Sequence, residues 1–216
     1  MGYGKEIMKK LILAVLCIIT IGLGIFFFYS GLSPNIRNAH PSGENLICFG
    51  NSLTYGIGAA AGHDYPSRLS ELLSEHVINA GVPGDTTSTA LERLDRDVLS
   101  HSPRIVFITL GGNDLKNGVP RKTAFDNLKI IVGKIQDEGA LVVLGGIDIP
   151  FWGKGFGDAY EELAEKTGAV LVPNVYKGVM GNSALMSDRI HPNSKGYQVM
   201  AEGFYRAVKP FLHGGE

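Results

Sequence analysis

Residues 45–54 read Asn-Leu-Ile-Cys-Phe-Gly-Asn-Ser-Leu-Thr, so that a short apolar run stops at Gly50 and Ser52 follows just after it. The run is too short for a helix and is bounded by polar and glycine residues, which predicts a buried first strand over residues 46–49. Ser52 would then lie beyond the carboxyl end of that strand, where ligands bind in open α/β sheets. A lone serine after a strand is most often a turn residue. The interpretation of Ser52 therefore depends on partners elsewhere in the chain.

Strands and helices alternate along the rest of the sequence. Apolar stretches rich in β-branched residues predict further strands at residues 77–80, 104–110, 140–144 and 169–172. Apolar residues at helical spacing predict helices around residues 65–73, 91–98, 125–135, 160–167 and 197–208. This alternation is typical of a parallel sheet with helices on both faces. We therefore expect a single three-layer α/β domain with about five strands over residues 44–216.

Composition limits the classes of partner. The chain has 216 residues, a formal net charge of -1 and a hydrophobic fraction of 44%, which suits one ordinary domain plus an N-terminal segment. The near-neutral balance gives no electrostatic footprint for nucleic acid, so no such partner is expected. Cys17 and Cys48 provide no disulfide framework, and no paired His/Cys cluster predicts a metal site. The oligomeric state stays open.

Residues 11–29 carry no charge and, at about 1.5 Å per residue, would nearly span the hydrocarbon core of a bilayer, which is about 30 Å thick. Lysines at positions 5, 9 and 10 precede this segment, whereas only Arg37 follows closely. The positive-inside rule then places residues 1–10 in the cytoplasm and the domain outside it, in the periplasm or the extracellular space. A cleaved signal peptide, which would make the protein secreted, usually has a shorter apolar region. We favour a retained transmembrane anchor, joined to the domain by a linker over residues 30–43.

Three predicted strand ends carry residues suited to acyl chemistry. Ser52 follows the first strand, Gly84 lies in the loop after the second, and Asn113 lies in the loop after the third. A serine that attacks an acyl carbonyl creates an oxyanion, which needs preorganised hydrogen-bond donors. The Ser52 N–H, the Gly84 N–H and the Asn113 side-chain amide are candidates for these donors. Taken singly, Gly84 and Asn113 would more often be turn or cap residues.

Residues 187–193 read Ser-Asp-Arg-Ile-His-Pro-Asn and precede the last predicted helix. A serine hydroxyl needs a general base, and that base needs a partner on its other ring nitrogen. In a tight turn, Asp188 can reach Nδ1 of His191 while Nε2 faces Ser52. The combination of nucleophile, donors and Asp-x-x-His pair predicts an active site with Ser52, Asp188 and His191 as catalytic residues.

These blocks resemble those of the SGNH, or GDSL-type, hydrolases, a family named for its Ser, Gly, Asn and His blocks. The resemblance covers about residues 45–212 and is strongest to the small periplasmic branch of acyl-thioesterases, lysophospholipases and arylesterases. It implies a flavodoxin-like sheet, a Ser-His-Asp mechanism through an acyl-enzyme, an oxyanion hole of Ser52, Gly84 and Asn113, and no cofactor. The chain departs from the family at Asn51, where an Asp is usual. This departure bears on local turn hydrogen bonding or pH response rather than on activity.

Parts of the sequence also suggest other functions. The glycine-rich residues 56–62 could suggest an NAD-dependent oxidoreductase, but a dinucleotide loop should open a helix directly and an acid should end the second strand. A non-catalytic carbohydrate- or lipid-binding module could share the fold, as could a carbohydrate O-acetyl esterase. The G-x-S-x-G elbow of α/β-hydrolases is absent from the sequence. Ser183 lies in a similar Gly-Asn-Ser tripeptide but follows no predicted strand, so it is read as a loop residue.

The substrate is expected to be a small-molecule or lipid-derived ester. Phe151 and Trp152 lie in a glycine-rich loop after the fourth predicted strand, where exposed aromatics would be costly unless they pack against something. With Leu115 and Val119, they are predicted to wall an apolar acyl or aryl slot. The alternative is that these aromatics close the top of the core.

Overall fold

The computed structural model describes residues 35–149 and 153–212, and the described residues from Ile36 onward form one compact unit. The predicted anchor at residues 11–29, the cytoplasmic segment 1–10, Phe151 and Trp152 lie outside the described residues. Among the described helices, none is both long and apolar enough to cross a membrane.

The centre of the domain is a five-stranded parallel sheet of order β2-β1-β3-β4-β5. Its strands are β1 (Asn45–Gly50), β2 (Val77–Gly81), β3 (Pro103–Thr109), β4 (Leu141–Gly145) and β5 (Val170–Val172). The predicted α/β class and strand number are confirmed. The order also has a switch point between β1 and β3, where successive crossovers leave the first strand in opposite directions and a crevice opens.

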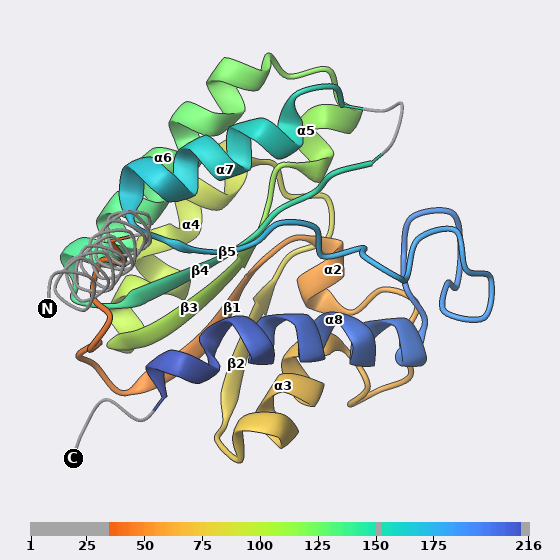
Figure 1. Cartoon of the computed structure of the whole chain (residues 1–216), viewed down its shortest axis with the longest axis horizontal. Coiled ribbons are helices and arrows are strands. Elements are labelled where there is room, and N and C mark those ends of the chain that lie inside the picture. The colour runs from red at the N-terminus through yellow and green to blue at the C-terminus, as the bar shows by residue number, and fades with distance from the viewer. Residues whose placement is uncertain (1–34, 150–152, 213–216) are drawn as a thin grey trace, which may run out of the picture. The chain divides into compact units, whose positions relative to one another are not determined.

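Helices cover both faces of the sheet (Figure 1). The longer ones are α3 (Tyr65–Leu73), α4 (Thr87–Asp97), α6 (Arg121–Asp137), α7 (Phe156–Thr167) and α8 (Ser194–Val208), with short 3₁₀ turns at Leu99–His101 and Lys209–Phe211. Helices α3 and α8 pack on one face, and α4, α6 and α7 pack on the other. Each of the five predicted helices is present.

Aromatic side chains pack between the sheet and the α3 and α8 layer, and between the helices α6 and α7 of the other layer. On the α3 and α8 face, the rings of Tyr65 and Phe204 stack at 5.2 Å, and Phe107 of β3 meets Phe204 edge-on at 5.7 Å. On the other face, Phe125 of α6 contacts Tyr160 and Phe156 of α7 at 4.9 and 5.5 Å. Burying such large apolar surfaces is the main favourable term in folding.

Two very short helices are present where the sequence predicted loops. These are α2 (Ser52–Tyr55), directly after β1, and α5 (Gly112–Lys116), directly after β3. Apolar periodicity cannot reveal helices this short, because they contain hardly more than one turn. Both therefore form at the strand ends that carry Ser52 and Asn113.

The first three strands end in register. Gly50 of β1 pairs with Gly81 of β2 and with Thr109 of β3. A side chain at Gly50 would clash with Thr54 and Thr109, so this strand end tolerates only glycine. The common end places the three following loops along the same edge of the sheet.

The described part of the predicted linker lies against the domain. Arg37 donates its backbone N–H to Gly168 at 2.9 Å and pairs with Asp137 at 2.7 Å. The Asn38 amide donates to the carbonyls of Gln136 and Ala140 at 2.8 and 2.9 Å. Residues 36–42 thus lie at the end of the sheet where β4 begins. Ser52 lies at the opposite end, where β1 stops.

Candidate active site

Ser52 is held by the turn that joins β1 to α2. It is the first residue of α2, and Asn51 caps this helix by accepting the Leu53 N–H on Oδ1 at 3.1 Å. Asn51 is buried. Its side-chain oxygen makes the local turn hydrogen bond that was in question because an Asn stands at this position. Thr54, two residues after Ser52, hydrogen-bonds Thr109 at the end of β3 and, at 2.9 Å, the hydroxyl of Tyr65. The serine is therefore anchored on both sides by buried contacts.

His191 connects Ser52 to Asp188. Its Nε2 lies 3.1 Å from Ser52 Oγ, and its Nδ1 lies 2.7 Å from Asp188 Oδ2. These are hydrogen-bond distances. The imidazole side chain is 15% exposed and that of Asp188 is 52% exposed. A base in contact with a hydroxyl, and oriented by a carboxylate on its other nitrogen, is the arrangement that activates a serine.

A tight turn sets the spacing of Asp188 and His191. Asp188 Oδ1 accepts the backbone N–H groups of Ile190 and His191 at 2.8 and 2.7 Å, while the Ser187 hydroxyl donates to the His191 carbonyl at 3.0 Å. Hydrogen bonds from the His191 ring, and then from the Ile190 backbone, lower the pKa of Asp188 to about 2. Asp188 is therefore an ionised carboxylate at any pH well above 2, and it can accept a hydrogen bond from the His191 ring.

Asn113 and Gly84 come from the neighbouring strand ends. Asn113 is on α5, and its Nδ2 donates to the Asp85 carbonyl at 2.8 Å, directly after Gly84. Gly84 has a φ of 89°, and an added Cβ would meet nothing within 4 Å. Its glycine is thus explained by the left-handed backbone rather than by crowding. The structure joins these two segments by the Asn113–Asp85 bond.

Buried polar contacts support this side of the site. The carboxylate of Asp114 is fully buried and accepts the Thr87 N–H and hydroxyl at 2.9 and 2.7 Å. It thereby ties α5 to the start of α4. Arg93 of α4 is also buried and contacts both Asp85 and Gly50. Arg93 could not be singled out from the sequence, since a single arginine on a helix gives no sign of the side it faces.

A small apolar cavity opens beside Ser52 and His191. It is walled largely by Leu53, Ile147, Ile149, Ile190 and Tyr176, with Asn51, Gly112, Asn113 and Lys116 completing the lining, and its volume is about 40 Å³. This is room for only a few water molecules. Ile147 and Ile149 follow β4 and Ile190 belongs to the Asp188 turn, so no local pattern marked them as neighbours.

The predicted slot residues Leu115 and Val119 do not line this cavity. Leu115 instead packs against Gly153, where a side chain would clash with it. The reason is the short helix α5, which turns Asn113 and Leu115 in different directions. The other two predicted wall residues, Phe151 and Trp152, are outside the described residues.

The competing sequence patterns find little support. The glycines at 56–62 follow α2 and precede α3, which starts only at Tyr65 with Asp64 as its cap, and β2 ends in Asn79-Ala80-Gly81 without an acid. A dinucleotide loop would have to open the helix itself. Ser183 is exposed in a turn of the loop before α8. Within residues 35–149 and 153–212, no cluster of three potential metal ligands occurs.

Comparison with known proteins points to one group. The family model for GDSL-like lipases and acylhydrolases matches residues 48–199. An arylesterase of Vibrio mimicus is 33% identical over 193 residues, covering 84% of this chain and 93% of the relative. An Escherichia coli K12 protein described as thioesterase 1/protease 1/lysophospholipase L1 is 27% identical over 178 residues, covering 79% and 86%.

A solved structure shares the whole architecture. The crystal structure of TesA superposes with a TM-score of 0.74 at 29% identity, covering 78% of this chain and 99% of that one. The likeness therefore spans the sheet and both helical layers.

Proposed function

The chain belongs to the GDSL-like lipase and acylhydrolase family, a group of hydrolases that act on ester bonds, and on this premise we propose that it hydrolyses carboxylic esters or thioesters through an acyl-enzyme on Ser52. The observation that carries the proposal is the hydrogen-bonded series from Ser52 Oγ through His191 to Asp188, at 3.1 and 2.7 Å. Ser52 is the nucleophile, His191 the general base and Asp188 the group that orients the imidazole.

The reaction proceeds in two halves. Ser52 Oγ attacks the acyl carbon while its proton passes to His191 Nε2. The tetrahedral intermediate then expels the alcohol or thiol, which takes that proton and leaves the acyl group on Ser52. In the second half, His191 takes a proton from water, the resulting hydroxide attacks the acyl carbon, and the carboxylic acid departs as Ser52 regains its proton. No cofactor enters either half.

The negative oxygen of each tetrahedral intermediate requires donors. We assign this role to the N–H of Ser52, the N–H of Gly84 and the amide of Asn113. Support comes from Asn113, which lines the cavity with Ser52 and His191 and whose amide is oriented by the Asp85 carbonyl at 2.8 Å. Donors held in place before the charge develops are the effective ones, because they cost no reorganisation during the reaction.

Hydrophobic acyl or aryl esters, including lysophospholipids, are the proposed substrates. The isoleucine walls of the cavity favour an apolar acyl group, and the predicted anchor at residues 11–29 would hold the domain near lipid. On the same reasoning the domain lies outside the cytoplasm, attached to the membrane unless the segment is cleaved. The small volume of about 40 Å³ favours one alternative, a carbohydrate O-acetyl esterase.

A substrate series separates these alternatives. We would measure kcat/KM with nitrophenyl esters and acyl thioesters of increasing chain length on the soluble domain. Activity that rises with chain length supports a lipid-derived substrate, whereas activity confined to acetyl esters supports the O-acetyl esterase. Trp152→Ala should lower kcat/KM for long or aromatic acyl groups more than for acetyl, by about 1–3 kcal/mol of discrimination.

Covalent labelling tests the catalytic assignment itself. A fluorophosphonate should label the wild-type chain on Ser52, and Ser52→Ala should lose both labelling and turnover while keeping the fold. Ser183→Ala is the matched control, since Ser183 ends a second Gly-Asn-Ser tripeptide elsewhere in the chain. This variant should retain both labelling and turnover. Persistent labelling in Ser52→Ala, or turnover unaffected by the substitution, would refute the nucleophile. A folded wild-type chain that is neither labelled nor active would indicate a binding module instead.

A further inference from the structure

We propose that Arg93 is a positioning residue for ester hydrolysis, setting the geometry between Ser52 and the oxyanion donors through one buried guanidinium group. The inference rests on the proposed roles of Ser52, Gly84 and Asn113, and it assigns a further residue that touches no substrate.

The guanidinium joins three segments of the chain. Arg93 Nε pairs with Asp85 Oδ2 at 2.6 Å, and Nη2 donates to the Gly50 carbonyl at 2.9 Å. The third nitrogen, Nη1, pairs with Asp97 on the same helix at 2.8 Å. The guanidinium carbon also lies 4.4 Å from the centre of the Phe49 ring, a cation–π distance. Every nitrogen of the fork therefore has a partner.

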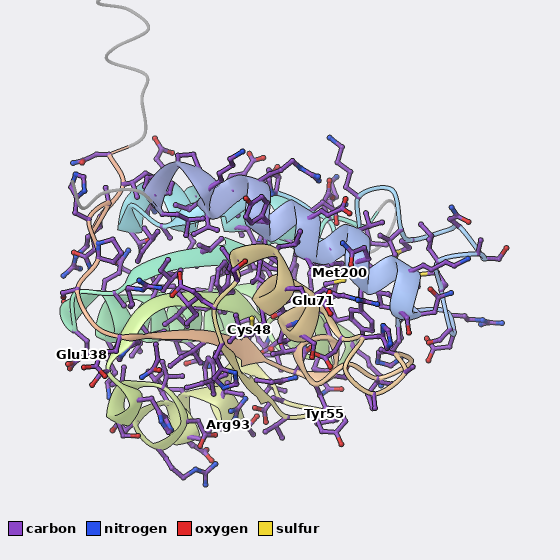
Figure 2. All side chains as sticks on the ribbon, turned by 90° about the horizontal axis from the view of Figure 1, so that it is seen from below. Cys48, Tyr55, Glu71, Arg93, Glu138 and Met200 are labelled. Carbon is purple, nitrogen blue, oxygen red and sulfur yellow. The ribbon has the colours of Figure 1, made fainter. Side chains whose placement is uncertain are left out.

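The Arg93 side chain is buried next to the carboxyl end of β1. Its side chain is only 8% exposed, and that of Asp85 is 9% exposed. Figure 2 shows Arg93 on the α4 side of β1, away from the labelled residues of α3 and α8. Two charges this deeply buried are costly to desolvate, and a pair of well-packed apolar residues is often at least as stable. Stability alone is thus a weak reason for an ion pair here.

Each partner of Arg93 is adjacent to a proposed functional group. Gly50 ends β1 two residues before Ser52, and its carbonyl also accepts the Val82 N–H at 3.0 Å. Asp85 follows Gly84 directly, and its own carbonyl accepts the Asn113 amide at 2.8 Å. The Arg93 side chain thus connects the turn that carries Ser52 to the segments of the two other proposed donors, Gly84 and Asn113, by no more than two hydrogen bonds. A shift of about 1 Å in such a group can cost about 10²-fold in rate.

Arg93→Lys tests this role while keeping the positive charge. A lysine ammonium is a point charge and cannot reproduce the planar fork that reaches Asp85 and Gly50 together. We expect kcat to fall about 10-fold or more with KM nearly unchanged, because misplaced donors weaken the transition state more than the ground state. Rates are referred to the fraction of sites titrated by a fluorophosphonate, so that unfolded protein does not count.

Arg96→Met is the matched control. Arg96 lies on the same helix and also pairs with Asp97, but its side chain is 76% exposed and its ion pairs are confined to that residue. It should keep the wild-type kcat. Leu94→Ala, in the core on the same helix, should lower the melting temperature while the folded fraction keeps its kcat.

A double-substitution cycle separates positioning from general support. In an Asn113→Ala background, Arg93→Lys should lower kcat by a clearly smaller factor than in the wild-type background, because the donor that it positions is already absent. The same factor in both backgrounds, or an unchanged kcat in the single variant, would overturn the proposal. Both outcomes leave Ser52→Ala inactive, whereas an active Ser52→Ala would refute the proposed function itself.

Arg93→Met removes the fork altogether and strands the Asp85 carboxylate, so we would pair it with Asp85→Asn, which removes the uncompensated charge. This double variant should show the same kcat loss as Arg93→Lys or a larger one. Wild-type kcat in the folded double variant would overturn the proposal, and if it does not fold, the Arg93→Lys cycle decides.

Discussion

Replacing Asn113 by alanine should lower kcat by about 10²–10³-fold, equivalent to about 2.7–4 kcal/mol of transition-state stabilisation. The amide nitrogen has two hydrogens, and one is used in the 2.8 Å bond to the Asp85 carbonyl. The other is available to an oxyanion in the cavity that Asn113 shares with Ser52 and His191. Because the Asp85 bond orients the amide before substrate arrives, the donor is preorganised, and the full range of the effect applies.

Steady-state kinetics with a nitrophenyl ester measure this loss. KM should change little, since the oxyanion forms mainly in the transition state. Asn38→Ala is a suitable control, because the Asn38 amide also braces backbone carbonyls, of Gln136 and Ala140, but at the opposite edge of the sheet. It should lower the melting temperature and leave kcat unchanged.

Two results would refute the reasoning about Asn113. A raised KM with an unchanged kcat would mean that Asn113 only positions the substrate. An equal loss of kcat in Asn38→Ala would mean that the effect follows stability rather than the donor.

The remaining predictions concern the imidazole, pH and the core. Asp188→Asn should lower kcat by about 10⁴-fold, measured at constant pH, because the substitution removes the carboxylate charge that orients the His191 imidazole; a loss below tenfold would contradict the assigned role. Hydrogen bonds hold the pKa of Asp188 at about 2, below its unfolded value, so its contribution to stability is full above about pH 4 and is lost as the pH falls through about 2. Asp188 therefore stays ionised above about pH 4, and the acid limb of a plot of log kcat/KM against pH should have a slope of one there, the slope expected when a single group loses its proton. A slope of two would show that the Asp188 carboxyl also titrates in that range. Phe204→Ala should reduce the free energy of unfolding in denaturant by about 3–5 kcal/mol, because the ring is fully buried against Tyr65 and Phe107; a loss under 1 kcal/mol would show that this core collapses around the gap.

The local features of the site were open to prediction from the sequence. The run before Gly50 shows a strand end, and the Asp-x-x-His spacing suits the turn in which Asp188 accepts the His191 N–H and ring nitrogen at 2.7 Å each. The alternation of strand and helix restricts the topology further, since crossovers between parallel strands are short and right-handed. These are properties of neighbouring residues, and neighbouring residues are what a single sequence displays.

Other features depend on contacts between distant segments and required the tertiary structure. Arg93 reaches Gly50, 43 positions away, and only the packing of α4 against β1 shows that it does so. The isoleucines of the cavity come from two separate loops. Leu115, which the sequence predicted to line the acyl slot, points elsewhere because it lies on a helix of five residues. The place of Ser52 after its strand and the Asp188–His191 spacing could thus be predicted from the sequence, because each depends on neighbouring residues. The cavity wall and the buried Arg93–Asp85 ion pair were decided by the folded structure, because long-range side-chain packing leaves no periodic signal in the sequence.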